Sequence, residues 1–108
     1  MVIVTPKHLD RAAAKYKNAA TELGSWEAIA SAVRWRNFPE VRETFPDADA
    51  VDGYVVFNIR HNRYRLITVI HYAKDLADRQ TQGHIYIRSV LTHNEYDNRA
   101  NWDKEYRQ

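Results

Sequence analysis

The sequence predicts an α+β fold in which N-terminal helices pack on a small antiparallel sheet of three to four strands, with a short C-terminal helix. Two observations predict this fold: apolar residues recur at helical spacing in the first half, and their period changes to two from Tyr54 onward. The length of 108 residues, 44% of them hydrophobic, suits a single domain spanning residues 1–108.

The first half is expected to hold an edge strand and two long helices. Val2–Val4 is short and β-branched, which favours the strand. Thr5 is expected to cap the first helix, with Pro6 at its first position, whereas Gly24 ends that helix and Ser25 caps the next. The buried stripes of the two helices are predicted to be Leu9, Ala12, Ala13, Tyr16, Ala20 and Leu23, followed by Trp26, Ile29, Ala30 and Val33.

The second half is expected to form an antiparallel meander. Pro39 opens a short helical turn through Thr44, and Asp47–Asp52 reads as an acidic loop. Short connections then favour antiparallel pairing, with the helices on one sheet face and arginine and tyrosine side chains on the other. The strands are predicted at Tyr54–Ile59, Arg63–Tyr72 and His84–Leu91, and the last of them should place His84, Tyr86, Arg88 and Val90 together on one face.

A short helix is predicted directly after the last strand. Thr92-His93-Asn94-Glu95 matches the capping box, so the helix should begin at His93 and carry Tyr96. The polar tail from Asn98 to Gln108 is expected to fray unless Trp102 docks on the domain.

Positive charge is concentrated in the second half. Residues 1–52 carry 7 Lys or Arg against 8 Asp or Glu, whereas residues 60–93 carry 6 against 2 together with four of the five histidines. A cationic region of this kind suits a polyanion such as nucleic acid, although a solvated strand face is the alternative explanation.

Several kinds of site are excluded or disfavoured. The chain has no cysteine, which rules out disulfides, thiolate zinc sites and a cysteine nucleophile and makes the cytoplasm the expected location. No apolar run approaches the roughly 20 residues of a membrane span, and no signal-peptide pattern begins the chain. The histidine spacing fits no helical zinc motif, the three glycines form no phosphate loop, and no serine lies in a nucleophile elbow, so neither metal nor cofactor is expected.

The remaining polar groups form a metal-free set of Arg, His and Tyr, which suits RNA cleavage through the 2′-hydroxyl of RNA. Such a reaction needs a base for the 2′ proton, cations for the phosphorane and an acid for the leaving 5′ oxygen. Arg65 and Arg88 lie mid-strand and are predicted to hold the scissile phosphate, because guanidinium meets two oxygens at once. His93, at a helix start that favours neutral imidazole, and either Tyr96 or His71 are predicted to move the protons.

Four further residues are predicted to contact the RNA. Arg60 and Asn62 lie in the expected hairpin turn, Arg63 follows it, and Lys74 lies in the loop between the last two strands. Asparagine in a hairpin turn often has a purely conformational role, so the contact by Asn62 has a simple alternative.

Three segments of the chain resemble the HigB toxin family of type II toxin–antitoxin systems. They are Trp35–Pro46, which resembles the helical part of the family, Val56–Ile67, which contains Asn58-Ile59-Arg60-His61-Asn62, and Ile87–Asp97 with its Thr-His-Asn-Glu-Tyr-Asp run. The resemblance implies a RelE-like fold, metal-independent cleavage of mRNA commonly tied to translating ribosomes, and neutralisation by a HigA-type antitoxin. Arg60-His61 stands where the family often has glycines, and the 73–83 loop is longer than usual.

Two other functions remain open at this stage. A non-catalytic RNA- or ribosome-binding inhibitor of translation would need the same basic face but no His–Tyr pair. A gyrase poison, as in a neighbouring branch of the same fold, would produce DNA damage signalling without RNA cleavage.

Overall fold

The computed structural model describes residues 1–61 and 63–102; Asn62, which the sequence predicts to contact RNA, and residues 103–108 lie outside the described residues. Across the described part, one sheet has the strand order β1-β5-β4-β3-β2. Its strands are β1 (Val2–Val4), β2 (Asp49–Val51), β3 (Tyr54–Ile59), β4 (Tyr64–His71) and β5 (His84–Thr92). The helices are α1 (Lys7–Lys15), α2 (Ala20–Ala32), α3 (Phe38–Thr44) and α4 (His93–Asp97), with 3-10 turns at Lys17–Ala19 and Arg99–Asn101.

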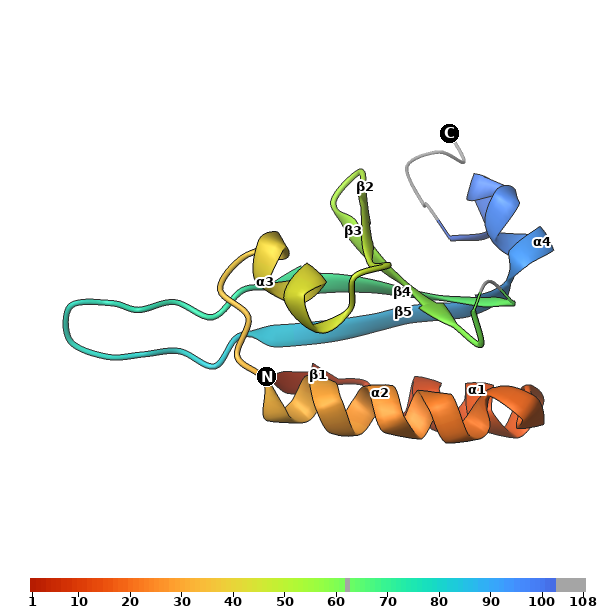
Figure 1. The fold of residues 1–108 in the computed structure, drawn as a ribbon, viewed down its shortest axis with the longest axis horizontal. Coiled ribbons are helices and arrows are strands. Elements are labelled where there is room, and N and C mark those ends of the chain that lie inside the picture. The colour runs from red at the N-terminus through yellow and green to blue at the C-terminus, as the bar shows by residue number, and fades with distance from the viewer. Residues whose placement is uncertain (62, 103–108) are drawn as a thin grey trace.

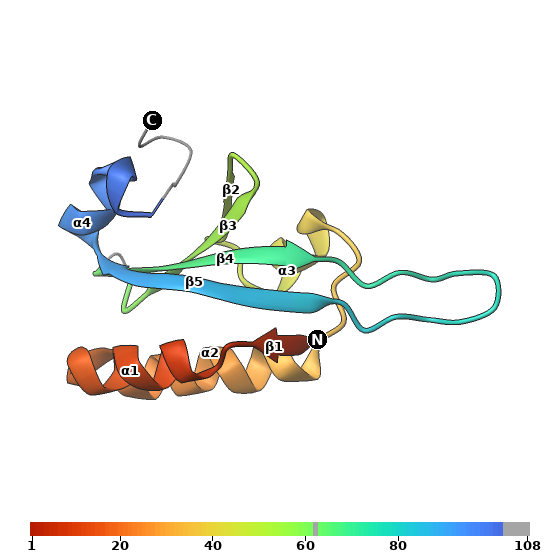
Figure 2. The ribbon, with the colours of Figure 1, turned by 180° about the vertical axis from the view of Figure 1, so that it is seen from behind.

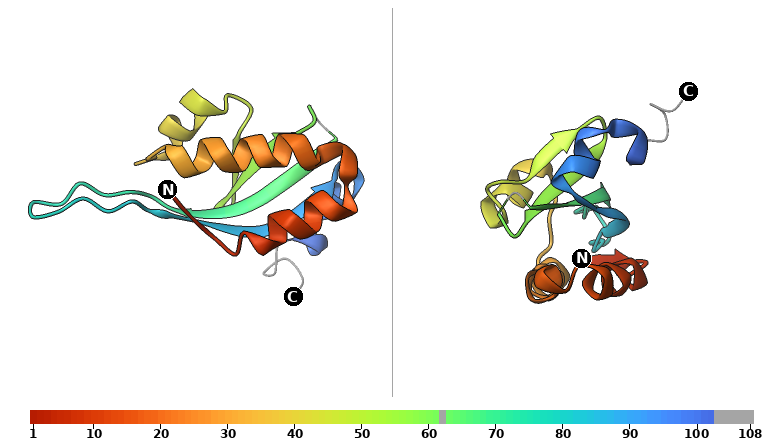
Figure 3. Two further views of the ribbon diagram at one scale, coloured as in Figure 1. Left: turned by 90° about the horizontal axis from the view of Figure 1, so that it is seen from below. Right: turned by 90° about the vertical axis from the view of Figure 1, so that its right-hand side faces the viewer.

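Helices α1 and α2 form a layer below the sheet, and α4 lies toward its other side (Figures 1 and 3). Helix α3 borders the main core, where its Val41 is fully buried. The predicted α+β class is therefore confirmed. The main core lies between the helix layer and the sheet, where Phe57 of β3 contacts Trp26 of α2 at a ring distance of 5.2 Å. Trp35 and Phe45, which flank α3, close the cluster around the same Phe57 ring at 6.0 and 5.3 Å. Among the described residues, no helix is long and apolar enough to cross a membrane.

The division between the first two helices differs from the prediction. Gly24 lies inside α2, and the helical run is interrupted at Tyr16 instead. A glycine within a helix costs about 1 kcal/mol, whereas burying Leu23 and Trp26, both 2% exposed, each contributes roughly 1.5–3 kcal/mol. The burial of Leu23 and Trp26 therefore outweighs the low helix propensity of Gly24. Thr5 also does not cap α1 through its side chain; its hydroxyl bonds to backbone carbonyls, and its backbone adopts a φ of 60°.

The sheet has more strands than predicted and is mixed rather than antiparallel. β1 is an edge strand as predicted, but it pairs parallel to β5. No short connection joins β1 and β5, so their relative direction is not restricted to the antiparallel one. The predicted acidic loop contains β2, whose hairpin with β3 turns at Asp52 and Gly53, both with positive φ. Asp-Gly is a strong signal for such a two-residue turn, and it could have revealed β2 from the sequence.

A β-bulge in β5 changes which residues share a face. Ile67 of β4 pairs with Ser89 while Thr68 pairs with Ile87, so Arg88 is the extra residue. Beyond the bulge, Val90 packs with the main core, whereas Tyr86 pairs with Val69 away from it. The predicted grouping of Tyr86 with Val90 is therefore wrong, because an inserted residue reverses the alternation.

The 73–83 segment extends as an arm beyond the end of β4 and β5 (Figure 2). Arg34 anchors its base by donating to the carbonyls of Thr81 and Lys74, at 3.1 and 2.9 Å, and by pairing with Asp75 at 2.9 Å. Arg36 joins Asp75 to Glu40 of α3. These arginines hold the pKa of Asp75 and of Glu40 below the usual range.

The base of this arm leads to a stability prediction at Gly83. Its φ is 73°, and a Cβ there would lie 2.6 Å from the backbone nitrogen of Ala73 and 2.7 Å from the carbonyl oxygen of His71. We expect Gly83→Ala to lower the free energy of unfolding by at least about 2 kcal/mol, from the left-handed backbone and the overpacking together. Urea denaturation measures the change.

Gly24→Ala is the matched control. A Cβ at Gly24 would meet nothing within 4 Å, so this helical substitution should instead stabilise the protein by roughly 0.5–1 kcal/mol. Equal effects of the two variants would contradict the strain at Gly83.

Candidate active site

The sheet face opposite α1 and α2 presents Arg65 and His71, two of the predicted site residues. On β4, alternation places Arg65, Ile67, Val69 and His71 on this face, and pairing brings Asn58 of β3 opposite Arg65. We call this the open face, although Trp102 and Tyr54 cover part of it in a second apolar cluster with Val56 and Ile67.

Arg65 and His93 are in direct contact. The Nη2 of Arg65 lies 3.1 Å from the Nδ1 of His93. Because a guanidinium can only donate, Nδ1 accepts this hydrogen bond and the proton of the neutral ring resides on Nε2. Nε2 in turn faces the carboxylate of Asp97 at 3.7 Å. The structure therefore brings together the cation and the imidazole that the sequence predicts to work on one phosphate.

Tyr96 completes this cluster. The guanidinium of Arg65 lies over its ring, 5.4 Å from the centroid. Burial, followed by the negative charge of Asp49, raises the pKa of the Tyr96 phenol. The hydroxyl thus stays protonated at neutral pH, and it is suited to donate a proton rather than to remove one. Arg65, His93 and Tyr96 are called the Arg–His–Tyr cluster below.

Trp102 supports Tyr96 from behind. The two rings stack at 5.1 Å with an interplanar angle of 15°, and the indole nitrogen donates to the Tyr96 carbonyl at 2.9 Å. Trp102 is 6% exposed, so it docks on the domain, which the sequence prediction left open. The sequence did not reveal that Trp102 would support Tyr96, because Trp102 lies in a tail of mostly polar residues.

The predicted capping box positions α4 and hence His93 and Tyr96. The Thr92 hydroxyl accepts from the Glu95 backbone nitrogen at 3.2 Å, and the Glu95 carboxylate accepts from the Thr92 backbone nitrogen at 2.9 Å. Tyr16 of α1 donates to the same carboxylate at 3.2 Å. The hydrogen bonds from Thr92 are the main reason that the pKa of Glu95 lies below its usual value.

This capping leads to a prediction of pH dependence. A carboxylate whose pKa is lowered in the folded state stabilises the protein at pH values above its ordinary pKa, which is 4.5 for Glu95. This contribution to stability is lost as the pH falls through the lowered pKa. We expect Glu95→Gln to be less stable than the original protein at pH 7, with the difference shrinking as the pH falls below 4.5. Urea denaturation at pH 7 and below pH 4.5 tests this; a difference that does not depend on pH would contradict it.

A cleft of about 310 Å³ opens beside the Arg–His–Tyr cluster. Arg65, Tyr96 and Asn58 form one side of it, while Arg42 and Asp49 come from α3 and β2. Neither Arg42 nor Asp49 was predicted from the sequence as a site residue. A β2 strand predicted from Asp52-Gly53 would have placed Asp49 at the sheet and made it a candidate.

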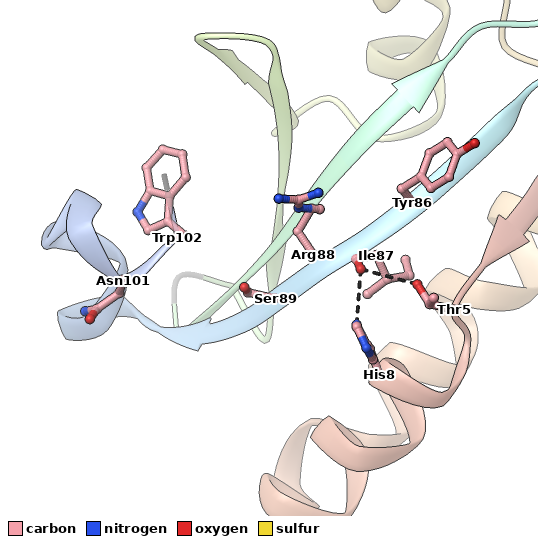
Figure 4. Close-up of a pocket in the computed structure, with 8 residues that line it drawn as sticks. All are labelled: Thr5, His8, Tyr86, Ile87, Arg88, Ser89, Asn101 and Trp102. Atoms are coloured by element: carbon pink, nitrogen blue, oxygen red, sulfur yellow. Dashed lines mark hydrogen bonds between the residues drawn. The ribbon is translucent and has the colours of Figure 1, made fainter. Parts of the chain in front are cut away.

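Arg88 lies in a separate cavity of about 360 Å³ (Figure 4). Its side chain projects from β5 on the same side as Tyr86, whereas Thr5 and His8 approach the strand from the helix layer. Both of these residues contact the carbonyl of Ile87, through the Thr5 hydroxyl at 3.4 Å and His8 Nδ1 at 3.2 Å. The structure thus places Arg88 in a different cavity from the cleft that Arg65 and Tyr96 line.

His71 is not brought to the cluster. It lies six residues from Arg65 along β4, about 20 Å at ~3.3 Å per residue, and it pairs with His84. Its ring instead lies 5.0 Å from that of Tyr86. Among the described residues, no group of three or more His, Cys, Asp or Glu side chains is arranged to hold a metal ion.

The predicted RNA contacts are dispersed. Arg60 turns its side chain to the Asn18 carbonyl at 2.9 Å, toward the helix layer rather than the open face. Arg63 is exposed, and its carbonyl accepts from the His93 backbone nitrogen at 3.0 Å, next to the cluster. Lys74 lies on the arm beyond β4.

Comparison with known proteins identifies the family. Residues 19–99 match the model of the HigB toxin, described as a RelE-like toxic component of a toxin–antitoxin system. The chain is 29% identical over 100 residues to the mRNA interferase toxin HigB of Escherichia coli K12, covering 90% of this chain and 88% of that protein. The mRNA interferases HigB of Escherichia coli O157:H7 and Shigella flexneri match equally well. The Arg–His–Tyr cluster lies entirely within the matched residues, and the chain belongs to the HigB toxin family.

Proposed function

We propose that this protein is a metal-independent endoribonuclease that cleaves mRNA and so arrests translation. The observation that carries the proposal is the contact of Arg65 with both His93 and Tyr96, at 3.1 and 5.4 Å. It joins a cation suited to phosphate, a proton acceptor and a protonated hydroxyl, and two of these residues, Arg65 and Tyr96, line an open cleft. The names of the HigB relatives, which are mRNA interferases, support the same activity.

In the proposed reaction, the scissile phosphate binds the Arg65 guanidinium. The phosphate then competes for the Arg65 Nη2 donor that His93 Nδ1 accepts from in the free protein. Released from that bond, Nδ1 removes the 2′-hydroxyl proton, and the 2′ oxygen attacks phosphorus. Tyr96 donates its proton to the departing 5′ oxygen, leaving a 2′,3′-cyclic phosphate and a 5′-hydroxyl. Arg65 stabilises the charge that develops on the phosphorane.

Three finer features belong to the same proposal. We infer that the mRNA is cut on translating ribosomes, in the cytoplasm, and that a HigA-type antitoxin neutralises the toxin. The excess of positive charge in residues 60–93 supports an RNA-rich target of this kind. Co-purification with the product of an adjacent open reading frame would test the antitoxin.

The test of cleavage compares an RNA oligonucleotide with the same oligonucleotide carrying one 2′-deoxy sugar at the cut site, in the presence of EDTA and with or without ribosomes. We expect cleavage of the first and none of the second, with a cyclic phosphate on the upstream product. Translation arrest with intact transcripts would overturn the proposal in favour of a non-catalytic inhibitor, and DNA damage signalling without RNA cleavage would favour a gyrase poison.

A further inference from the structure

We propose that the cavity beside Arg88 binds one nucleotide of single-stranded RNA that flanks the cut site, which rests on the proposed function. This assigns Arg88 to a neighbouring phosphate and leaves the scissile phosphate to Arg65. The cavity has a volume of about 360 Å³, within the range of roughly 300–1,000 Å³ that is typical of small-ligand sites.

The bulge in β5 presents Arg88 to this cavity. Because Arg88 has no partner residue on β4, its backbone is locally displaced, and bulges commonly redirect a side chain beside a functional site. Arg88 is exposed, and among residues 1–61 and 63–102 no carboxylate forms an ion pair with it. An exposed guanidinium of this kind, held on a strand, is suited to a phosphate.

The other walls supply groups that recognise a base and a sugar. Tyr86 offers an aromatic ring, on which a base can stack irrespective of its sequence. Thr5, His8 and Asn101 add hydroxyl, imidazole and amide groups around the cavity (Figure 4). The RNA class is favoured over a purely apolar ligand because charged, polar and aromatic groups converge here.

Trp102 connects this cavity to the Arg–His–Tyr cluster. It lines the cavity and also stacks on Tyr96 at 5.1 Å. Arg88 is three residues along β5 from Leu91, the partner of Arg65, which corresponds to about 10 Å at ~3.3 Å per residue. A short extended run of RNA can therefore reach from Arg65 past Trp102 to Arg88.

The test measures the affinity of fluorescent 2′-O-methyl RNA, which cannot be cleaved through its 2′ oxygen. For the unmodified protein, an oligonucleotide that extends past the cut site should bind about 10- to 100-fold more tightly than a dinucleotide, the gain expected from one charge-assisted phosphate contact. Arg88→Ala should abolish most of this gain, and Tyr86→Ala should reduce it. Because binding is measured, the result does not depend on whether the protein cleaves RNA.

Arg79→Ala is the matched control, since Arg79 is a 68% exposed arginine on the arm and its loss changes the net charge equally. The Arg79→Ala variant should still bind the longer oligonucleotide more tightly than the dinucleotide, by the same factor as the unmodified protein. Equal weakening of both RNA lengths by Arg88→Ala would place Arg88 on the scissile phosphate and overturn the proposal. An unchanged RNA affinity with weaker binding of the purified antitoxin would also overturn it, because the cavity would then be a protein-docking site.

Discussion

Replacing Arg65 with alanine is expected to lower the rate of RNA cleavage by about 10²–10³-fold, the usual loss when one donor to a developing oxyanion is removed. Arg65 is half-buried in the middle of β4 and contacts both His93 and Tyr96. No other cation of the described residues contacts both proton-transfer groups, so water would have to replace it. Single-turnover cleavage of a labelled RNA at saturating protein measures the loss.

Arg65→Lys and Arg79→Ala provide the controls for this prediction. Lysine keeps the charge but cannot meet two phosphate oxygens in a planar fork, so it should restore only part of the rate. Arg79→Ala removes the same charge from the exposed arm and should cleave like the unmodified protein. If Arg65→Ala cleaved within about threefold of the unmodified protein, far less than the loss expected for such a donor, the scissile phosphate would have to bind elsewhere.

Tyr96→Phe is expected to lower the cleavage rate by about 10²–10⁴-fold, the range typical of a positioned proton donor. The phenylalanine ring can keep the stacking on Trp102 and the contact with Arg65, which involve the ring and not the hydroxyl. RNA affinity and unfolding free energy should therefore change little. The raised pKa of Tyr96 also predicts that activity persists into mildly alkaline pH and falls only as the phenol ionises.

Tyr54→Phe is the matched control, because Tyr54 contacts the same Trp102 ring at 5.4 Å but lies on β3 outside the Arg–His–Tyr cluster. Its loss of a hydroxyl should leave cleavage unchanged. An RNA with a better 5′ leaving group, such as a phosphorothiolate, should restore much of the activity of Tyr96→Phe. Absence of this rescue would show that Tyr96 acts by stacking or positioning rather than as the acid.

Local signals were reliable where neighbouring residues alone specify the structure. The capping box at Thr92 and Glu95 formed as predicted, because its hydrogen bonds join residues three apart. The β3–β4 hairpin and the short α3 helix were likewise apparent from period and turn residues. Because these elements were predicted, His93, Tyr96 and Arg65 could be identified from the sequence as candidate catalytic residues.

Long-range packing determined the features that the local sequence patterns could not predict, such as the extent of α2 and the register of β5. Gly24 stayed helical because Leu23 and Trp26 are buried on either side. His71 was predicted as an alternative to Tyr96 for proton transfer because it shares a face of β4 with Arg65, but its distance from α4 depends on the tertiary fold. The bulge at Arg88 could not be inferred from alternation, since it depends on the register with β4.

The α+β class, the cationic second half and a set of Arg, His and Tyr side chains suited to metal-free RNA cleavage were predictable from the sequence, because they depend on composition and short-range spacing. The folded structure was needed to show that Arg65, rather than Arg88, contacts His93, and that Trp102 lies between Tyr96 and the Arg88 cavity. These contacts depend on strand register, on the inserted residue in β5 and on the docking of a distant indole, all of which result from pairing and burial across the whole chain.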